Sequence, residues 1–334
     1  MIRRNFLVSA TLGLAGGGLG RGAAAAEASP AATPGEAGKA LIGPDEAIDA
    51  ARFHVDRRLL GTRFGTISYL DRGTGPAALF IHGFPLNGFQ WRGAIDRLSP
   101  LRRCLAPDLL GMGYTDPRPG QSLGPHAQVE MLLDFLDELG VGEIDLVGND
   151  SGGTVAQLLA ARAPGRVRTL LLTNCDTEID NPPPALATVI ALAREGDYPD
   201  AWLVPWFHDK ELARRKELSD GYSRAGFPSD AALEVYLGPL IATPRRKALT
   251  NEFTLALEPN VLRAEHERLK RFPGEVRIVW GTADGLFARD SPAFLDGLFP
   301  NSRGIRALTG ARFFFPEEYP DLIAEEARRL WLPS

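Results

Sequence analysis

The octapeptide LVGNDSGG places two candidate nucleophiles side by side, Asp150 and Ser151. An apolar run ends within it, at Gly148, and the helix-like stretch TVAQLLAARA follows it. A sharp turn from strand to helix requires small residues two positions before and after the residue at its tip. Asp150 has Gly148 and Gly152 at those positions, whereas Ser151 has Asn149 on one side. The spacing therefore favours Asp150 as the nucleophile.

An aspartate at such a turn indicates substitution at a saturated carbon. The carboxylate attacks a carbon that bears a leaving group, which leaves an alkyl ester on the enzyme. Water must then hydrolyse the ester with the help of a base. The backbone N–H of Ser151, at a helix N-terminus, is placed to bind the oxyanion of that second step. The stretch IHGFP follows an earlier apolar run, and we expect Phe84 to supply a second backbone donor.

The elements that must position these residues alternate along the chain from about residue 53. LLGTRFGTISYLDRG predicts a hairpin with GT at its turn. The runs AALFIHGF, RRCLAPDLL, EIDLVGND, VRTLLLTNCD and EVRIVWGTAD predict strands buried on both faces of a parallel sheet. Their alternation with helical stretches predicts an α/β sandwich. Residues 179–260 contain no strand-like run, so we expect a helical cap between the sixth and seventh strands.

Four motifs in this order, HGFP, APDLLGMGYTD, GNDSGG and GTAD, resemble the α/β-hydrolase superfamily over residues 53–334. The aspartate at the turn is similar to that of the epoxide hydrolases and haloalkane dehalogenases. The resemblance implies the α/β-hydrolase fold, with a mostly parallel central sheet flanked by helices. It also implies that Asp284 is the catalytic acid, with Asp176 as an alternative position. Asp284 also suits an ordinary helix N-cap or loop turn.

The family resemblance bears on the substrate as well. Dehalogenases hold the departing halide with Trp or Asn side chains, but Ser151 and Phe84 occupy the corresponding positions here. Epoxide hydrolases protonate the epoxide oxygen with cap tyrosines, and the cap offers Tyr198, Tyr222 and Tyr236. An epoxide is therefore favoured over an alkyl halide.

The catalytic histidine of the family has no counterpart. The family pattern resembles GAGHF, and the matching stretch here is LTGARFFFPEE, with Phe313 at the histidine position. Among the five histidines, His126 and His208 are the candidates for a substitute base, although a surface role is favoured for both. His54 and His266 are expected at the surface, and His82 belongs to the HG turn.

Two classes of function stay open. The first is a hydrolase without the usual base, in which Asp284 orders and polarises the water. The second is a non-catalytic relative that binds a small apolar ligand; a Ser151 esterase fits less well because of the turn spacing. Burial and like charge should raise the pKa of Asp150 or Asp284. Arg312 would offset this effect if its side chain turns inward.

The N-terminus has the features of an export signal. Residues 1–26 have a charged start, an apolar middle and a small-residue cleavage site, and Arg3 and Arg4 resemble the twin-arginine motif. The composition of residues 27–44 predicts a flexible linker. We expect residues 45–178 and 261–334 to form the hydrolase core. We expect a periplasmic or extracellular location, with no stable membrane insertion after cleavage.

The composition bounds the partners. A net charge of −5 gives no indication of a basic surface that would bind nucleic acid. Cys104 and Cys175 lack metal-ligand spacing, and each is typical of a small buried apolar residue. We expect no metal and no cofactor, and the expected partner is a small-molecule substrate or ligand.

Overall fold

The computed structural model describes residues 49–332 of the chain, so the expected signal peptide and linker lie outside the described residues. The strands are β1 (Arg58–Thr62), β2 (Gly65–Arg72), β3 (Ala77–Ile81), β4 (Arg103–Pro107), β5 (Asp116–Pro117), β6 (Ile144–Asp150), β7 (Val167–Cys175), β8 (Glu275–Gly281) and β9 (Ser302–Leu308). The α-helices are α1 (Ala50–Asp56), α2 (Arg92–Leu98), α3 (Pro125–Glu138), α4 (Ser151–Arg162), α5 (Ala187–Glu195), α6 (Val204–His208), α7 (Lys210–Ala213), α8 (Asp230–Ile241), α9 (Pro244–Ala256), α10 (His266–Leu269), α11 (Ser291–Leu298), α12 (Phe315–Glu318) and α13 (Pro320–Trp331).

One sheet runs in the order β1-β2-β4-β3-β6-β7-β8-β9, and the short β5 pairs with β2. The strands β1, β2 and β4 pair antiparallel, and all pairs from β4 through β9 are parallel. Every residue of β3 and β6 is buried, which explains the continuous apolar sequence of β3 and the apolar residues Ile144, Leu146 and Val147 of β6. The predicted mostly parallel sheet flanked by helices is confirmed.

Two details of the sheet differ from the sequence prediction. The hairpin turn consists of Arg63 and Phe64, and the two GT pairs lie in the strands on either side of it. Strand β9 was not among the predicted apolar runs. It forms the edge of the sheet and none of its residues is buried, so it does not need the apolar run of a central strand.

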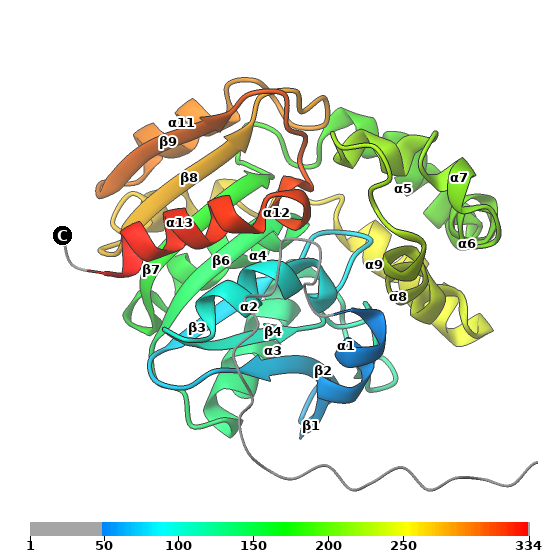
Figure 1. Ribbon diagram of the computed structural model, residues 1–334, viewed down its shortest axis with the longest axis horizontal. Coiled ribbons are helices and arrows are strands. Elements are labelled where there is room, and N and C mark those ends of the chain that lie inside the picture. The colour runs from blue at the N-terminus through cyan, green and yellow to red at the C-terminus, as the bar shows by residue number, and fades with distance from the viewer. Residues whose placement is uncertain (1–48, 333–334) are drawn as a thin grey trace, which may run out of the picture. The chain divides into compact units, whose positions relative to one another are not determined.

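Helices cover both faces of the sheet (Figure 1). On one face α2 packs against α13, which also contacts β7 and β8. On the other face α4 packs on β6 and β7 and contacts α3 and α10, while α11 packs on β8 and β9. Because α4 begins directly after β6, the residue at this junction lies at the carboxyl edge of the sheet.

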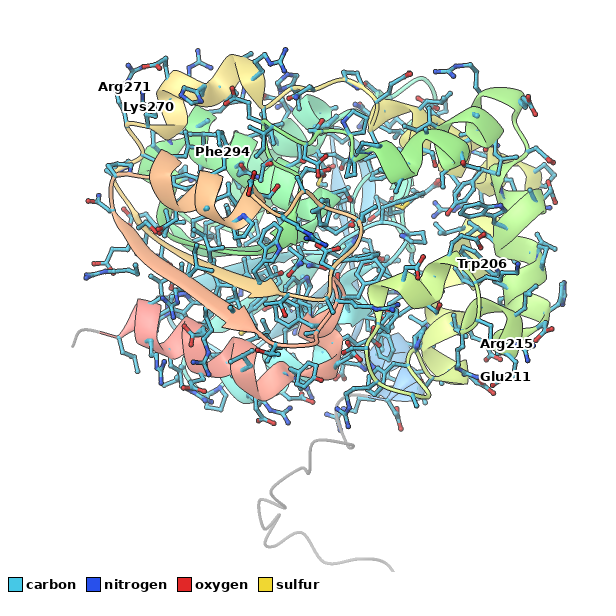
Figure 2. The ribbon with its side chains drawn as sticks, turned by 90° about the horizontal axis from the view of Figure 1, so that it is seen from above. Trp206, Glu211, Arg215, Lys270, Arg271 and Phe294 are labelled. Atoms are coloured by element: carbon cyan, nitrogen blue, oxygen red, sulfur yellow. The ribbon has the colours of Figure 1, made fainter. Side chains whose placement is uncertain are left out.

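A helical segment lies between β7 and β8 and beyond the carboxyl ends of the strands (Figure 1). It contains α5 to α9 and the short helices η4 (Pro199–Leu203) and η5 (Glu217–Gly221). These helices fall inside residues 179–260, and we refer to that range as the cap. Figure 2 shows Trp206 of α6 and Glu211 of α7 on the cap side, and Lys270 and Arg271 on the opposite side.

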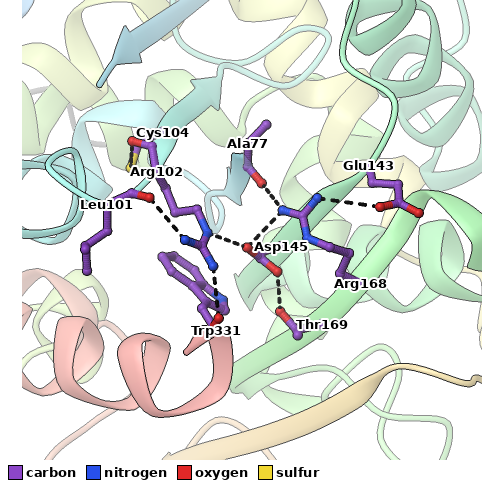
Figure 3. Close-up of polar contacts among 9 residues, drawn as sticks. All are labelled: Ala77, Leu101, Arg102, Cys104, Glu143, Asp145, Arg168, Thr169 and Trp331. Carbon is purple, nitrogen blue, oxygen red and sulfur yellow. Dashed lines mark hydrogen bonds and ion pairs between the residues drawn. The ribbon is translucent and has the colours of Figure 1, made fainter. Parts of the chain in front are cut away.

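The amino edge of the sheet is held by a buried carboxylate, Asp145, near the start of β6 (Figure 3). It accepts hydrogen bonds from Arg102 at 2.8 Å, Arg168 at 3.0 Å and Thr169 at 2.9 Å. Arg102 also donates to the backbone carbonyl of Trp331 at the end of α13. The two guanidinium groups compensate the buried charge and join β6, β7 and α13.

Candidate active site

The junction of β6 and α4 places Asp150 at the tip of a sharp turn. Among the described residues, Asp150 is the one non-glycine residue with a positive φ, at 55°. A Cβ added to Gly152 would lie 2.3 Å from the backbone oxygen of His82, and one added to Gly148 would lie 2.9 Å from Cβ of Ala156. The turn therefore excludes side chains two residues before and after Asp150, as the sequence spacing predicts. Strained backbone of this kind concentrates at functional sites.

The carboxyl of Asp150 is held by backbone donors. The Phe84 N–H donates to Oδ1 of Asp150 at 2.8 Å, and the Ser151 N–H also stabilises the charged form. Gly83 permits this approach, because a Cβ there would lie 2.6 Å from Cβ of Asp150. Both residues expected to form the oxyanion hole thus surround the carboxyl. Burial raises the pKa of Asp150 from 3.8 to about 6, against these hydrogen bonds, and Asp284 adds to the rise.

Asp150 opens into a pocket of about 350 Å³ between the sheet edge and the cap. Its walls are mainly apolar and aromatic, and they include Phe84, Val189, Trp202, Leu218, Phe287 and Phe313. The same pocket is lined by a second carboxyl, Asp176, immediately after β7. The site can enclose a small apolar molecule and expose it to the carboxyl groups of Asp150 and Asp176, and the cap residues Glu217 and Asp220 also contribute to the lining.

The carboxyl of Asp284, the expected acid, accepts hydrogen bonds from neighbouring groups. Its Oδ2 accepts from Asn174 at 2.6 Å, and its Oδ1 accepts from the backbone N–H groups of Leu286 and Phe287. Its neighbours Ala283 and Gly285 line the pocket, but Asp284 does not. Burial raises its pKa as it does that of Asp150, and the expectation was a rise for at least one of the two. The geometry does not support Asp284 as the group that polarises the water.

Asp176 contacts the pocket directly. It is 6% exposed, and its Oδ2 accepts a hydrogen bond from the Thr154 hydroxyl at 2.9 Å. Burial, and then the charge of Asp150, raise the pKa of Asp176 from 3.8 to about 8. The sequence marked Asp176 only as an alternative acid position, because its relation to Asp150 depends on the pairing of β6 with β7.

The three cap tyrosines have different surroundings. Tyr198 is buried and lines the pocket, with its ring 5.8 Å from that of Phe84. Tyr222 and Tyr236 do not line the pocket, which corrects the prediction for these two. The Tyr222 hydroxyl donates to Glu317 at 2.7 Å, and the Tyr236 hydroxyl accepts from Arg92 at 3.2 Å. The two hydroxyls thus contact the buried ion pair between Arg92 and Glu317, which the sequence did not indicate.

None of the five histidines replaces the missing base. His126 and His208 are exposed, and neither lines the pocket, so the position considered for His208 above the turn is wrong. His82 is buried, and its Nε2 accepts from the Leu109 backbone at 3.0 Å, which fixes it as a structural residue. His54 is exposed, and His266 lies 2.5 Å from Glu178.

Phe313 lines the same pocket as Asp150, and its side chain is buried. Its ring centroid is 4.5 Å from that of Phe314. Arg312 does not pair with either aspartate. Its guanidinium donates to the backbone oxygen of Ser219 at 3.0 Å and lies 3.4 Å from Asp220. The expectation that Arg312 offsets the buried charge is therefore wrong, because this side chain binds the cap.

A buried amide network, missed by the sequence analysis, connects the loops of the site. The Gln90 side chain accepts from Gly83 N–H at 3.0 Å and donates to Asn149 at 2.5 Å. The Asn149 amide in turn donates to the backbone oxygen of Phe313 at 2.8 Å and to those of Thr173 and Asn174. Asn149 thus fits the position before Asp150 because its side chain points into the sheet edge. No sequence signal identified this role, since its partners are distant in the chain.

Within residues 49–332, no group of three or more His, Cys, Asp or Glu side chains is arranged to hold a metal ion. In the same range, no helix is both long and apolar enough to cross a membrane. Cys104 and Cys175 are buried free thiols.

Comparison with known proteins identifies the fold family. Residues 76–319 match the family model of the alpha/beta hydrolase fold. Haloalkane dehalogenase 2 from Mycobacterium bovis is 30% identical over 288 residues, which cover 83% of this chain and 95% of that protein. Epoxide hydrolase 1 from Siraitia grosvenorii is 44% identical over 119 residues, or 35% of this chain and 38% of the relative.

Solved structures show the same fold. A haloalkane dehalogenase from Bradyrhizobium elkani superposes with a TM-score of 0.65 at 23% identity, covering 82% of this chain and 98% of the other. An epoxide hydrolase superposes with a TM-score of 0.67 at 20% identity, with the same coverage of 82% and 98%. The match to the family model spans most of the described residues and includes the turn, the pocket loops and the cap. The chain therefore belongs to the α/β hydrolase fold family.

Proposed function

We propose that this protein is a hydrolase in which Asp150 attacks a small apolar electrophile and forms an alkyl ester. The observation that carries the proposal is the hydrogen bond from Phe84 N–H to Oδ1 of Asp150 in an apolar pocket. One carboxylate oxygen is thereby oriented by the backbone while the carboxyl faces the pocket. If Ser151 were the nucleophile, Asn149 would stand two residues before it, where the turn requires a small residue. The Asn149 side chain is instead held in the amide network.

An epoxide suits the pocket better than an alkyl halide. The positions next to the turn that hold halide in dehalogenases carry Ser151 and Phe84 here. Tyr198 lines the pocket, and burial followed by Glu217 raises its pKa, so its hydroxyl stays protonated and can donate a hydrogen bond to an epoxide oxygen. Relatives that match the chain include both an epoxide hydrolase and a haloalkane dehalogenase.

The ester on Asp150 is expected to persist, because Phe313 stands where a histidine base would lie. Incubation with styrene oxide should add one hydroxyalkyl group to the intact protein, located on Asp150 by peptide mass spectrometry. Asp150→Asn is nearly isosteric and should form no adduct. An adduct that forms on Asp150→Asn but not on Ser151→Ala would refute the assignment of the nucleophile.

A second candidate function is binding without chemistry, and the absence of a histidine from the pocket lining favours it. In that case styrene oxide and its unreactive analogue ethylbenzene would both raise the melting temperature, and neither would leave a mass increase. A mass increase on Asp150 excludes this candidate.

Export remains part of the proposal. Because the export receptor reads paired guanidinium groups, changing Arg3 and Arg4 to Lys should hold the protein in the cytoplasm. Fractionation of cells that express the parent and the double variant tests this, and N-terminal sequencing should find exported material beginning near Glu27. Exported protein that begins at Met1 would exclude the cleavage.

A further inference from the structure

The pocket brings a second carboxyl to the nucleophile. Cys175 at the end of β7 pairs with Asp150 in the parallel register, and Asp176 is the next residue. Both aspartates are 6% exposed and line the same pocket. No histidine lines it. A proton required by the reaction must therefore come from a carboxyl, a tyrosine or solvent.

Hydrogen bonds orient the Asp176 carboxyl. The amide of Asn181 donates to the Thr154 hydroxyl at 3.3 Å, and this hydroxyl donates its own proton to Oδ2 of Asp176 at 2.9 Å. Oδ2 is thus an acceptor in this arrangement. When Asp176 is protonated, the proton is therefore carried by Oδ1, the oxygen that the Thr154 hydroxyl does not occupy.

We infer that Asp176 is the general acid that protonates the epoxide oxygen when Asp150 attacks the ring, an assignment that rests on the proposed function. Asp150 forms a C–O bond to the epoxide carbon, and the bond from that carbon to the epoxide oxygen breaks. The electron pair passes to the oxygen, which takes the proton of Asp176. The products are a hydroxyalkyl ester of Asp150 and a carboxylate on Asp176, which regains its proton from solvent.

The surroundings of Asp176 suit this role. Burial, and then the neighbouring Asp150 carboxylate, raise the pKa of Asp176 to about 8, while the Thr154 hydroxyl opposes the rise. An acid is most effective when its pKa lies near the working pH. The phenol of Tyr198 has a pKa raised well above that range by burial, so it can orient the epoxide but retains its proton.

Other ionisable groups also lie around the two aspartates. Helix α4 faces Asp176 with the uncharged Thr154 and Gln157. The other ionisable groups near Asp176, near Asp150 or in the pocket lining are Cys175, Asp180, Tyr198, Glu217, Asp220, Asp284 and Arg312. The only cation in this set, Arg312, is bound to the cap at Ser219 and Asp220.

The parent protein alone provides the first test. The rate of adduct formation is measured by quenched intact-protein mass spectrometry between about pH 5 and about pH 9.5, a range that brackets both carboxyl groups. With styrene oxide the rate should rise as Asp150 ionises near pH 6 and fall as Asp176 ionises near pH 8. With 1-iodobutane only the rise should appear, because iodide leaves without a proton.

Variants provide the second test. Asp176→Asn should lower the rate with styrene oxide by about 10²-fold or more, the usual scale of general-acid catalysis, and lower the rate with 1-iodobutane far less. Asp180→Asn is the matched control: it neutralises a neighbouring buried carboxylate that does not line the pocket, so the fall at alkaline pH should remain. Thr154→Val should move that fall to higher pH, since it removes a donor that stabilises the carboxylate.

The outcomes separate the two proposals. If the parent forms no adduct with either compound, both the proposed function and the role of Asp176 are overturned. If the parent forms the Asp150 ester, but styrene oxide shows no fall at alkaline pH or Asp176→Asn reacts as fast as the parent, only the role of Asp176 is overturned. A loss of reactivity in Asp176→Asn that is equal for both compounds also overturns it, because it would indicate a structural effect.

Discussion

Asp150 has to be both buried and ionised, and the surrounding backbone resolves this conflict. Burial favours the neutral carboxyl, while Phe84 and Ser151 N–H groups favour the anion, and the resulting pKa of about 6 lies below neutral pH. Asp150 is therefore mostly ionised at pH 7. Asp176, in the same pocket but with a pKa of about 8, is mostly protonated. Two identical side chains thus acquire different protonation states from their environments.

Phe313→His should restore a base for ester hydrolysis. The backbone at this position is fixed by the hydrogen bond from Asn149, so an imidazole would enter the pocket that Phe313 now lines. We expect the Asp150 ester to be hydrolysed about 10²–10⁴-fold faster, the usual contribution of general-base catalysis. Single-turnover decay of the adduct measures this rate. Phe313→Asn provides a polar control without a base, and equal decay in the two variants would contradict the prediction.

The raised pKa of Asp176 also predicts a pH-dependent stability. Between about pH 4 and pH 8 the unfolded chain has lost this proton while the folded protein keeps it, so the free energy of unfolding falls as pH rises. Asp176→Asn lacks this loss. Its stability relative to the parent should increase between pH 5 and pH 8, by about 1.4 kcal/mol for each pH unit below the folded-state pKa. Urea unfolding at both pH values tests this, and a gap that does not change with pH would exclude it.

At the scale of elements, α12 connects the loop after β9 to the cap. The Phe314 N–H donates to the Gly221 oxygen at 2.8 Å, and Glu318 accepts from the Ser223 N–H at 3.0 Å. Glu317 forms a buried ion pair with Arg92 of α2 at 2.8 Å. The segment that carries Phe313 is therefore clamped between core and cap.

Tyr222→Phe should weaken this clamp without changing the pocket lining. It removes the hydroxyl that donates to the buried Glu317 at 2.7 Å, and a hydrogen bond to a charged group contributes about 1.5–3 kcal/mol. We expect the free energy of unfolding to fall by that amount in urea denaturation. Tyr319→Phe is the control, because the Tyr319 hydroxyl makes no hydrogen bond within residues 49–332. Equal losses in the two variants would show that the Tyr222 hydroxyl has no special role.

At the scale of the whole molecule, the sheet has a reactive edge and a structural edge. The carboxyl ends of β6 and β7 carry Asp150 and Asp176, and the amino ends carry the ion pairs of Asp145 (Figure 3). Because of this separation, the reactive edge can keep a strained backbone and carboxyl groups that are not paired with cations. Packing and ion pairs elsewhere stabilise the fold.

Asp145→Ala should therefore destabilise the protein strongly. It leaves Arg102 and Arg168 without their shared carboxylate, and breaking a buried pair costs about 3–5 kcal/mol. Asp137→Ala, which breaks an exposed pair with Arg166, should cost about 1 kcal/mol or less. Chemical denaturation of both variants measures the difference, and similar losses would contradict the assigned importance of the buried pair.

The sequence alone determined the features that depend on local sterics. Glycines two residues before and after Asp150 identify the tip of the turn, because a Cβ at either would collide with its neighbours. The continuous apolar run of β3 identifies a central strand, because both of its faces are buried. The absence of a histidine at Phe313 is likewise visible in the sequence.

Tertiary structure alone decided where each polar side chain points. Of three cap tyrosines only Tyr198 lines the pocket, since Tyr222 binds a glutamate 95 residues away. Arg312 turns to the cap, and Asp176 shares the pocket with Asp150 through the pairing of β7 with β6. A long polar side chain can satisfy its hydrogen bonds in several directions at similar cost, so its direction is set by partners that only folding brings near.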